Sequence, residues 1–333
     1  MSTVPDAPFS TASGLQAGYT YRQLTGPRFV SVHRRRGIWD VPAASRTLLE
    51  LLAADRLVLP SQAAISHLTG LALYGLEVDP GPRRHWSTSH QETSRLRSIV
   101  LHRRQSLGEV RQIEGLPVLC AARCLADVAP HVSIVWLVGA GDALIHSGVL
   151  TIGELREFAN GSFHGSQRLR QAVRLMRERS ASFRESGTRL IMACSGLPEP
   201  ELNVRLYDAC GAFVGKPDFL WRKQSVFAEY DGWYHERDAD QRDYDIHRME
   251  RLRRLRLEPV TLTSSDYARP VMLSQRLWQA FAAQGFGGER PLFDLRQWQS
   301  WSTPPRGRRD PRRAETPPPR LLQRNSPEPD APR

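Results

Sequence analysis

PDFLWRKQSVFAEYDG, residues 217–232, decides the predicted fold of this chain, because two apolar runs flank the short polar segment RKQ as in two paired strands. Side chains alternate between the two faces of a strand, so Glu229 and Asp231 point the same way, about 7 Å apart. If the strands pair, Asp218 joins them on one surface. Three carboxylates there would repel one another, and a hard divalent cation such as Mg²⁺ removes that cost.

Turn chemistry is an alternative explanation for two of these carboxylates. An aspartate that follows proline, as Asp218 does, is often a turn residue, and the pair Asp231-Gly232 is a common signal for the end of a strand. Glu229 is harder to explain in this way. It is flanked by apolar and aromatic residues, where a carboxylate without a partner is costly to bury.

The segment around this hairpin has the pattern of an α/β domain of roughly 115 residues. A polar, serine-rich stretch at residues 177–186 separates it from what precedes, so we expect a domain boundary there. The expected elements alternate between helix and strand: helix 183–195, strands 202–208, 213–221 and 225–231, helix 238–255, strand 258–263 and helix 266–286.

The first 75 residues predict a small region that is similar to a winged helix. Short helical segments precede a hairpin centred on Arg36-Gly37. Arg34, Arg35 and Arg36 would lie on the wing, where they either contact phosphates or form an ordinary exposed charged turn. Residues 43–76 have helical apolar spacing, which includes Ala64 and Ile65.

Residues 76–180 predict further helices and strands. RRHWSTS (83–89) and IVLHRRQSL (99–107) are typical of short strands, and LPVLCAARCLADVA (116–129) leads from a strand into a helix. The apolar stretch 131–149 is interrupted by Gly139 and Gly141, so it predicts a buried helix and not a membrane span. We expect those glycines to allow close packing.

Composition favours a polyanionic partner, since the formal net charge is +11. Of the 46 basic residues only Lys216 and Lys223 are lysine, and genomic base composition is an alternative explanation for so many arginines. The first residues have no secretory pattern, so a cytoplasmic protein without a membrane partner is expected. Residues 301–333, rich in proline and arginine, predict a disordered tail.

The motifs carry a resemblance. P-D-F followed by E-x-D-G-x-x-H, from Pro217 to His235, resembles the PD-(D/E)XK nuclease superfamily, most closely the very-short-patch-repair-like (Vsr-like) endonuclease domains of actinobacterial type. GLPEPELNV before these motifs and VTLTSSD after them are also similar, over residues 181–288. The resemblance implies a restriction-endonuclease-like mixed sheet flanked by helices. It also implies that Asp218 and Glu229 bind Mg²⁺, with Mn²⁺ as a substitute, so that a metal-activated water attacks phosphorus.

The chain departs from this family at Asp231, where the superfamily usually has lysine. Asp231 would then serve as a third metal ligand, and Lys216 or Lys223 would take the place of the usual lysine as the positively charged side chain. His235 is a candidate general acid or base. On the first helix, Glu185 either faces the metal, as in similar folds, or closes a capping box with Ser182.

A second basic position follows the hairpin. Arg248 lies three residues after Asp245, so the two either form an intrahelical pair that braces the site or leave Arg248 to bind phosphate.

The N-terminal region resembles, more weakly, the AbiEi-type antitoxin-like proteins. The cues include GPRFVSVHRRRGIW and SHLTGLALYGL, and they imply a winged-helix DNA-binding region (1–75) followed by an antitoxin-like segment (76–180). The predicted architecture is therefore α/β, with a nuclease-like C-terminal domain preceded by an α+β region. The predicted function is a Mg²⁺-dependent DNA endonuclease. The alternative is a non-catalytic DNA-binding regulator or antitoxin of a type IV toxin–antitoxin system.

Overall fold

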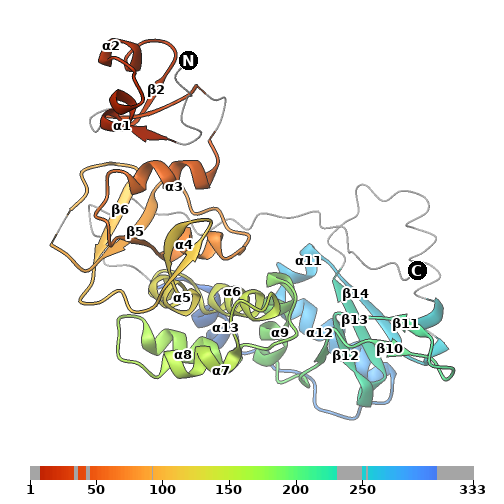
Figure 1. The fold of residues 1–333 in the computed structure, drawn as a ribbon. Helices are drawn as coiled ribbons and strands as arrows, with labels where there is room; N and C mark the ends of the chain where they lie inside the picture. The colour runs from red at the N-terminus through yellow and green to blue at the C-terminus, as the bar shows by residue number, and fades with distance from the viewer. Residues whose placement is uncertain are drawn as a thin grey trace. The chain divides into compact units, whose positions relative to one another are not determined.

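The computed structural model describes residues 8–33, 37–42, 46–91, 93–230, 250–252 and 254–305. The chain forms two compact units, whose described parts are residues 8–127 (unit 1) and residues 128–305 (unit 2) (Figure 1). The boundary predicted at residues 177–186 falls inside unit 2.

Unit 1 begins with a three-stranded sheet of order β1-β3-β2. Its elements are β1 (Phe9–Ser10), α1 (Thr11–Gln16), α2 (Tyr21–Leu24), β2 (Val30–His33) and β3 (Ile38–Asp40). Phe29 anchors its small core, with edge-to-face contacts to Phe9 and Tyr19. Antiparallel pairing of β2 with β3 confirms the predicted hairpin. The wing residues Arg34, Arg35 and Arg36 lie outside the described residues, and the winged helix stays a prediction.

The larger sheet of unit 1 has five strands in the order β6-β5-β4-β8-β7. Its elements are α3 (Leu48–Arg56), β4 (Ala64–Ile65), α4 (His67–Leu73), β5 (Arg84–Thr88), β6 (Ile99–Arg103), β7 (Val110–Ile113), β8 (Leu116–Leu119) and α5 (Ala121–Val128). The strands predicted at β5, β6 and β8, and the helix after β8, are confirmed.

The helical prediction for Ala64 and Ile65 is wrong. These residues form the central strand β4, where Ile65 is paired with Trp86 on one side and Val118 on the other. Ladder hydrogen bonds on both sides satisfy the buried backbone groups of this short segment. A two-residue apolar step has no periodicity that distinguishes a strand from a helix turn.

A buried carboxylate ties the elements of unit 1 together. Asp55 on α3 is fully buried and accepts hydrogen bonds from Arg84 (Nε 2.5 Å, Nη2 2.7 Å) and from the indole of Trp86 (3.3 Å). Its other contact is His33 Nε2 of β2, at 3.0 Å. A charge without water is stable only when it is paired and hydrogen-bonded, and Asp55 meets both conditions.

Unit 2 begins with a layer of helices. They are α6 (Ile134–His146), α7 (Ile152–Ala159), α8 (Ser166–Leu175) and α9 (Phe183–Cys194), joined later by α13 (Leu295–Ser302). A Cβ atom added at Gly139 would collide with the Phe183 ring of α9, and one at Gly141 with Met176. The predicted buried helix and its close-packing glycines are therefore confirmed. No helix among the described residues is long and apolar enough to cross a bilayer.

A mixed four-stranded sheet of order β14-β13-β12-β9 forms the rest of unit 2. The elements are β9 (Glu201–Leu202), β10 (Leu206–Tyr207), β11 (Phe213–Gly215), β12 (Phe219–Trp221), the 3₁₀ turn η1 (Arg222–Gln224), β13 (Val226–Tyr230), β14 (Glu258–Leu262), α11 (Ser264–Tyr267) and α12 (Pro270–Ala283). Strands β12 and β13 are antiparallel, whereas β13 and β14 are parallel. The predicted mixed α/β architecture is confirmed, and a restriction-endonuclease-like topology stays a prediction.

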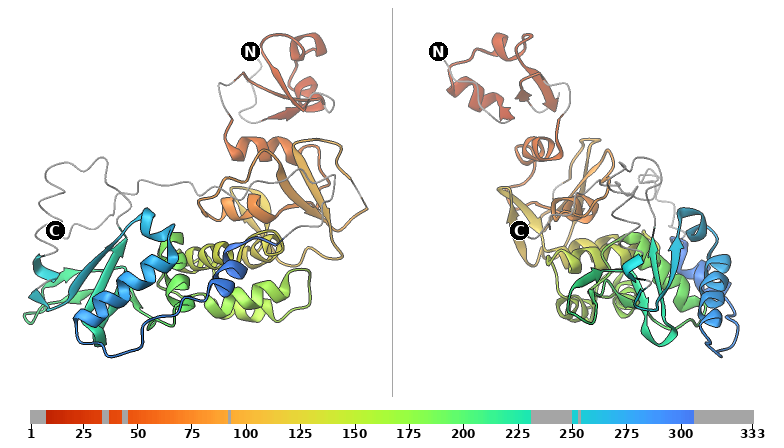
Figure 2. Two further views of the ribbon diagram at one scale, coloured as in Figure 1. Left: turned by 180° about the vertical axis from the view of Figure 1, so that it is seen from behind. Right: turned by 90° about the vertical axis from the view of Figure 1, so that its right-hand side faces the viewer.

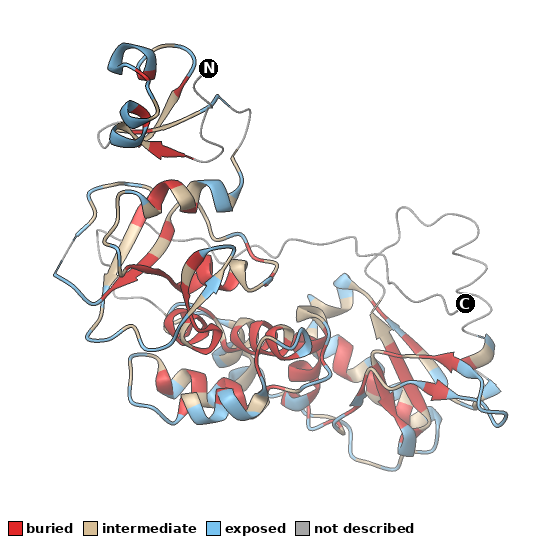
Figure 3. Ribbon diagram, viewed as in Figure 1, coloured by how far each residue is buried: buried red, intermediate tan, exposed pale blue. Residues whose placement is uncertain are grey.

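Both faces of this sheet are covered. One face packs on α9 and on α12 (Figure 2), whose Leu277 and Phe281 are fully buried. The other face packs on Leu252 through Leu220 and Phe227. Within this sheet, β12 and β13 are the most buried strands (Figure 3).

Several predicted elements are divided in the structure. The predicted strand 213–221 is two strands in different sheets, since β11 pairs with β10 alone among the described strands, and Pro217 between them has no N–H for a ladder. The predicted helix 266–286 divides at Pro270, which begins α12. Part of the predicted helix 238–255 and most of the tail lie outside the described residues. Helix α13 extends to Ser302, so the first residues assigned to the disordered tail are helical.

Candidate metal and nucleic-acid site

The hairpin of β12 and β13 positions the two principal carboxylates. Phe219 is paired with Ala228 in this ladder, and continuing the same register by one residue brings Asp218 opposite Glu229. The predicted strand pairing is therefore confirmed. Both carboxylates are half-buried at the open end of the hairpin.

Alternation along the strands places both carboxylates on one face. Leu220 and Phe227, each two residues from one of them, pack in the same cluster with Leu252. Asp218 and Glu229 therefore continue the side of the sheet that Leu252 covers.

Asp218 is held by backbone groups of its neighbours. Its Oδ2 accepts a hydrogen bond from the Tyr230 N–H at 2.8 Å, and its carbonyl oxygen accepts one from the Asn203 N–H at 3.1 Å. The first bond crosses the hairpin and fixes the carboxylate beside the end of β13. The second ties Asp218 to the segment that joins β9 to β10.

Glu185, in the first turn of α9, is a third carboxylate at this place. It is buried, and its Oε2 accepts hydrogen bonds from the Ala181 N–H (2.9 Å) and from Asn203 Nδ2 (2.6 Å). Burial, and then the negative charge of Asp218, raise the pKa of Glu185 to about 7. A cation near both groups would favour the ionised form and lower that pKa.

The capping-box interpretation of Glu185 holds in part, and its contact with a metal stays a prediction. The hydroxyl of Ser182, the N-cap of α9, accepts a hydrogen bond from the Glu185 N–H at 3.1 Å, which is half of a capping box. The Glu185 carboxylate reaches Ala181 rather than the Ser182 N–H, and it interacts with Asp218. Its position serves the helix start and the acidic site together.

Asn203 joins the acidic groups, and the sequence analysis missed it. Its backbone is left-handed (φ 49°), a conformation that asparagine tolerates better than most residues. Nδ2 donates to the Arg179 carbonyl oxygen (2.9 Å) and to Glu185, while its N–H bonds to Asp218. The only signal in the sequence was its place within GLPEPELNV, which does not indicate which side chain it contacts.

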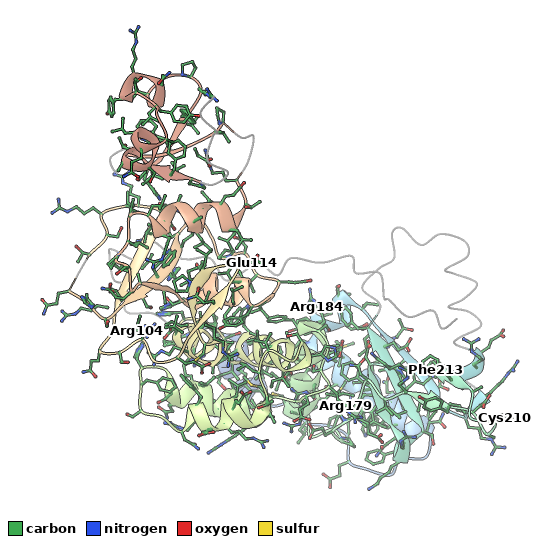
Figure 4. All side chains as sticks on the ribbon, in the orientation of Figure 1. Arg104, Glu114, Arg179, Arg184, Cys210 and Phe213 are labelled. Atoms are coloured by element: carbon green, nitrogen blue, oxygen red, sulfur yellow. The ribbon has the colours of Figure 1, made fainter. Side chains whose placement is uncertain are left out.

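Arg184 is a cation beside the site that was also missed. Its guanidinium lies over the Tyr267 ring, 4.7 Å from the centroid, and 5.9 Å from that of Tyr230. Figure 4 labels it next to the sheet of unit 2. Such stacking orients an arginine while its N–H groups still contact an anion.

Lys216 and Lys223 differ in how well each could replace the lysine that the superfamily usually has at the position of Asp231. Lys223 lies in η1, at the turn end of the β12–β13 hairpin, opposite the end that holds Asp218 and Glu229. It therefore does not fit the role. Lys216 is half-buried two residues before Asp218, at the correct end.

Six more predicted site residues lie outside the described residues. They are Asp231, His235, Arg248 and the arginines of the wing, Arg34, Arg35 and Arg36. Each stays a prediction from the sequence.

The described carboxylates alone do not make a closed metal cage. Within the described ranges, a single group of three or more histidine, cysteine or acidic residues has ligand atoms all within 4.8 Å of one another, and it is His67, His85 and His102 in unit 1. A cation at Glu185, Asp218 and Glu229 would therefore need water molecules or a further residue to complete its shell. Mg²⁺ usually keeps several waters and takes only one or two carboxylates, so this donor set fits it.

Comparison with known proteins gives no relatives: no protein-family model, no curated protein and no solved structure matches the chain. Function must therefore be inferred from the residues.

Proposed function

We propose that unit 2 is a Mg²⁺-dependent DNA endonuclease that hydrolyses phosphodiester bonds. The observation that supports this most is the interaction of Glu185 with Asp218 at the hairpin end where Glu229 also lies. Two elements far apart in the sequence deliver these carboxylates to one place, where the pKa of Glu185 is raised to about 7. Acidic groups held together in this way are typical of sites that bind a cation.

Asp218 and Glu229 would bind the ion directly, and Glu185 would contact it directly or through water. When bound, Mg²⁺ would supply a water of lowered pKa and offset charge on the leaving oxygen. Asn203 orients Glu185 through its 2.6 Å hydrogen bond. Asp231 is a further ligand in this proposal, and His235 moves a proton as general acid or base.

Arg184 takes the role that a lysine has in related folds. Its guanidinium lies over Tyr230, the residue after Glu229, and arginine is suited to binding phosphate oxygens through two N–H groups at once. Lys216 is the second candidate for the same contact. Arg248 and the wing arginines Arg34, Arg35 and Arg36 would neutralise DNA phosphates farther away, in agreement with the net charge of +11.

The alternative function is a DNA-binding regulator or antitoxin without catalysis. Two observations favour it. Asp231 stands where a lysine is usual, and the three described carboxylates are not within the 4.8 Å spacing at which ligand atoms surround one ion.

Cleavage of supercoiled plasmid DNA with Mg²⁺ tests the proposal. We expect nicking by the wild-type chain and a loss of at least about 100-fold in Asp218→Asn and Glu229→Gln, since both remove a metal ligand. Glu157→Gln, on the exposed side of α7, is the matched control and should keep full activity. Circular dichroism checks that each variant is folded.

Equal nicking by wild type and both variants would show that the activity does not belong to this site. DNA binding without cleavage by any folded form, with Mg²⁺ or Mn²⁺, would favour the regulator.

A further inference from the structure

Unit 1 contains three histidines that no part of the proposed nuclease uses. His67 begins α4, His85 lies on β5 and His102 on β6. Ser87 of β5 is paired with His102 in the parallel ladder, so His85 and His102 are diagonal neighbours on one face of the sheet. One ligand nitrogen from each of the three residues lies within 4.8 Å of the others.

The three rings are already in mutual contact. His85 Nδ1 and His102 Nε2 are 2.9 Å apart, and these two rings are nearly parallel, with 15° between their planes. The His67 ring stacks on that of His102, with centroids 3.8 Å apart. His67 is 9% exposed and the other two are half-buried, so the cluster is partly accessible to solvent.

The backbone that carries these rings is fixed. The His85 N–H donates to Thr69 Oγ1 of α4 (2.9 Å), and the His85 carbonyl oxygen accepts from the Ser66 N–H (3.0 Å). His67 itself has a left-handed backbone (φ 55°), which is uncommon for any residue but glycine and unfavourable by roughly 1–2 kcal/mol. The fold therefore keeps the His67 ring at this place at an energetic cost.

A polar network lies behind His67. Its Nδ1 is 3.0 Å from the Ser66 hydroxyl and 3.6 Å from Oδ2 of Asp127, a buried carboxylate on α5. Ser66 occupies the N-cap position of α4, but its side chain makes no hydrogen bond to the first turn of that helix. Its hydroxyl instead accepts a hydrogen bond from the Ser87 hydroxyl (2.8 Å). A carboxylate beside one ring nitrogen favours the proton there, which directs the lone pair of Nε2 away from the network.

Two arginines balance the charge of Asp127. Arg104, labelled in Figure 4, forms an ion pair with its Oδ2, and Arg123 forms one with Oδ1 at 3.0 Å. Asp127 is thus held in position from two sides.

We propose that His67, His85 and His102 bind one divalent transition-metal ion of the zinc class. The ligand atoms would be Nε2 of His67, Nδ1 of His85 and Nε2 of His102. Imidazole nitrogen suits Zn²⁺ and its neighbours and not Mg²⁺. Three protein ligands leave a fourth tetrahedral position for water or a substrate atom, an open arrangement.

Binding requires small side-chain movements. Zn–N bonds of 2.0–2.1 Å in tetrahedral geometry need about 3.3 Å between ligand nitrogens, so His85 and His102 separate slightly from their 2.9 Å contact. His67 turns out of its stack about the Cβ–Cγ bond, a torsion with broad minima. Asp127 acts as a positioning residue for the His67 ring.

Zinc binding by the full chain tests this site. The chain would carry Asp218→Asn and Glu229→Gln, so that the acidic site of unit 2 does not contribute. Competition with a coloured zinc chelator should give one Zn²⁺ per chain. His85→Ala, His102→Ala or His102→Gln should weaken binding by at least about 100-fold, more than the loss of an outer partner causes. Zn²⁺ should also raise the Tm of the parent chain and not that of these variants.

His90→Ala is the matched control, because His90 is exposed in the same unit and belongs to no cluster with three ligand atoms among the described residues. In the parent chain, which carries Asp218→Asn and Glu229→Gln, this substitution should leave the affinity for Zn²⁺ unchanged. Co²⁺ should give visible absorption bands typical of tetrahedral nitrogen ligation, and these bands should disappear in the His102 variants. Absence of Zn²⁺ binding by the folded parent chain, or equal binding by the parent and the His85 and His102 variants, would overturn the proposal and leave a stacked cluster of histidines without a metal.

Discussion

Replacement of Glu185 by glutamine should stabilise the metal-free protein. Folding raises the pKa of Glu185 from 4.5 to about 7, through burial first and the charge of Asp218 second. Such a rise corresponds to about 3 kcal/mol of unfavourable free energy when the carboxyl is ionised in the folded state. The carboxyl is 6% exposed, so little of this is screened by water.

The pH dependence follows from the direction of the shift. Between about pH 4.5 and 7 the folded chain holds a proton that the unfolded chain has released. The stability that Glu185 contributes is therefore complete below about pH 4.5 and is lost as the pH rises to about 7. Both hydrogen bonds to Glu185 end on Oε2, so the amide oxygen of Glu185→Gln can accept both. The variant keeps these bonds without the charge.

Thermal unfolding in a metal chelator measures the effect. At about pH 8 we expect the Tm of Glu185→Gln to exceed that of the wild type by several degrees, as an upper value of about 3 kcal/mol implies for a unit of this size. At about pH 4.5 the difference should nearly vanish. Glu157→Gln, at an exposed position of α7, should leave the Tm unchanged at both pH values.

The same substitution should weaken Mg²⁺ binding, because it removes a negative charge from the acidic site. A Tm equal to that of the wild type at about pH 8, or the same increase at both pH values, would refute the raised pKa of Glu185.

One substitution in each unit, with its own control, tests the packing of that unit by thermal or urea unfolding. Asp55→Ala leaves the buried guanidinium of Arg84 without its carboxylate and should lower the free energy of unfolding by about 3–5 kcal/mol. Its control, Glu109→Ala, removes an exposed ion pair and should lower that free energy by less than about 1 kcal/mol. Similar losses in the two variants would contradict the buried network around Asp55. Gly139→Ala adds a methyl group that has no room between α6 and α9 and should lower the free energy of unfolding by about 1–3 kcal/mol. Its control, Gly153→Ala on α7, meets only an ordinary contact and should be neutral or stabilising by up to about 1 kcal/mol. A larger loss of stability in Gly153→Ala than in Gly139→Ala would contradict the packing described for α6.

Local sequence patterns were sufficient for the hairpin that carries the acidic site. Alternating side chains and the short polar turn between residues 221 and 226 determine which residues of β12 and β13 face one another, and the pairing of Phe219 with Ala228 agrees with that prediction. The long apolar stretch likewise predicted α6, and its glycines predicted close packing, which Gly139 makes against Phe183 of α9.

Interruptions by single residues were harder to predict. Pro217 lies between β11 and β12, and Pro270 begins α12 at a break that apolar spacing does not record. The pair Ala64–Ile65 continued a helical apolar spacing by coincidence, and only tertiary pairing makes it a strand.

Contacts between distant residues were not predictable. Asn203 reaches Glu185 because of a left-handed backbone position between two strands, and Arg184 lies over rings that come from β13 and α11. The histidine cluster likewise requires β5 and β6 to be parallel neighbours with the start of α4 beside them. The spacing of residues along the sequence does not predict these contacts between different elements.

Calorimetric titration of the metal-free chain with Mg²⁺ above pH 7 tests the acidic site most directly. Imidazole is a poor ligand for Mg²⁺, so the histidines of unit 1 should not contribute heat. We predict binding of Mg²⁺ by the wild type and by Glu157→Gln, with loss of that binding in Asp218→Asn and in Glu229→Gln. Folded wild-type protein that binds no Mg²⁺, with or without DNA, or binding that is equal in all four proteins, would contradict the metal site and with it the nuclease.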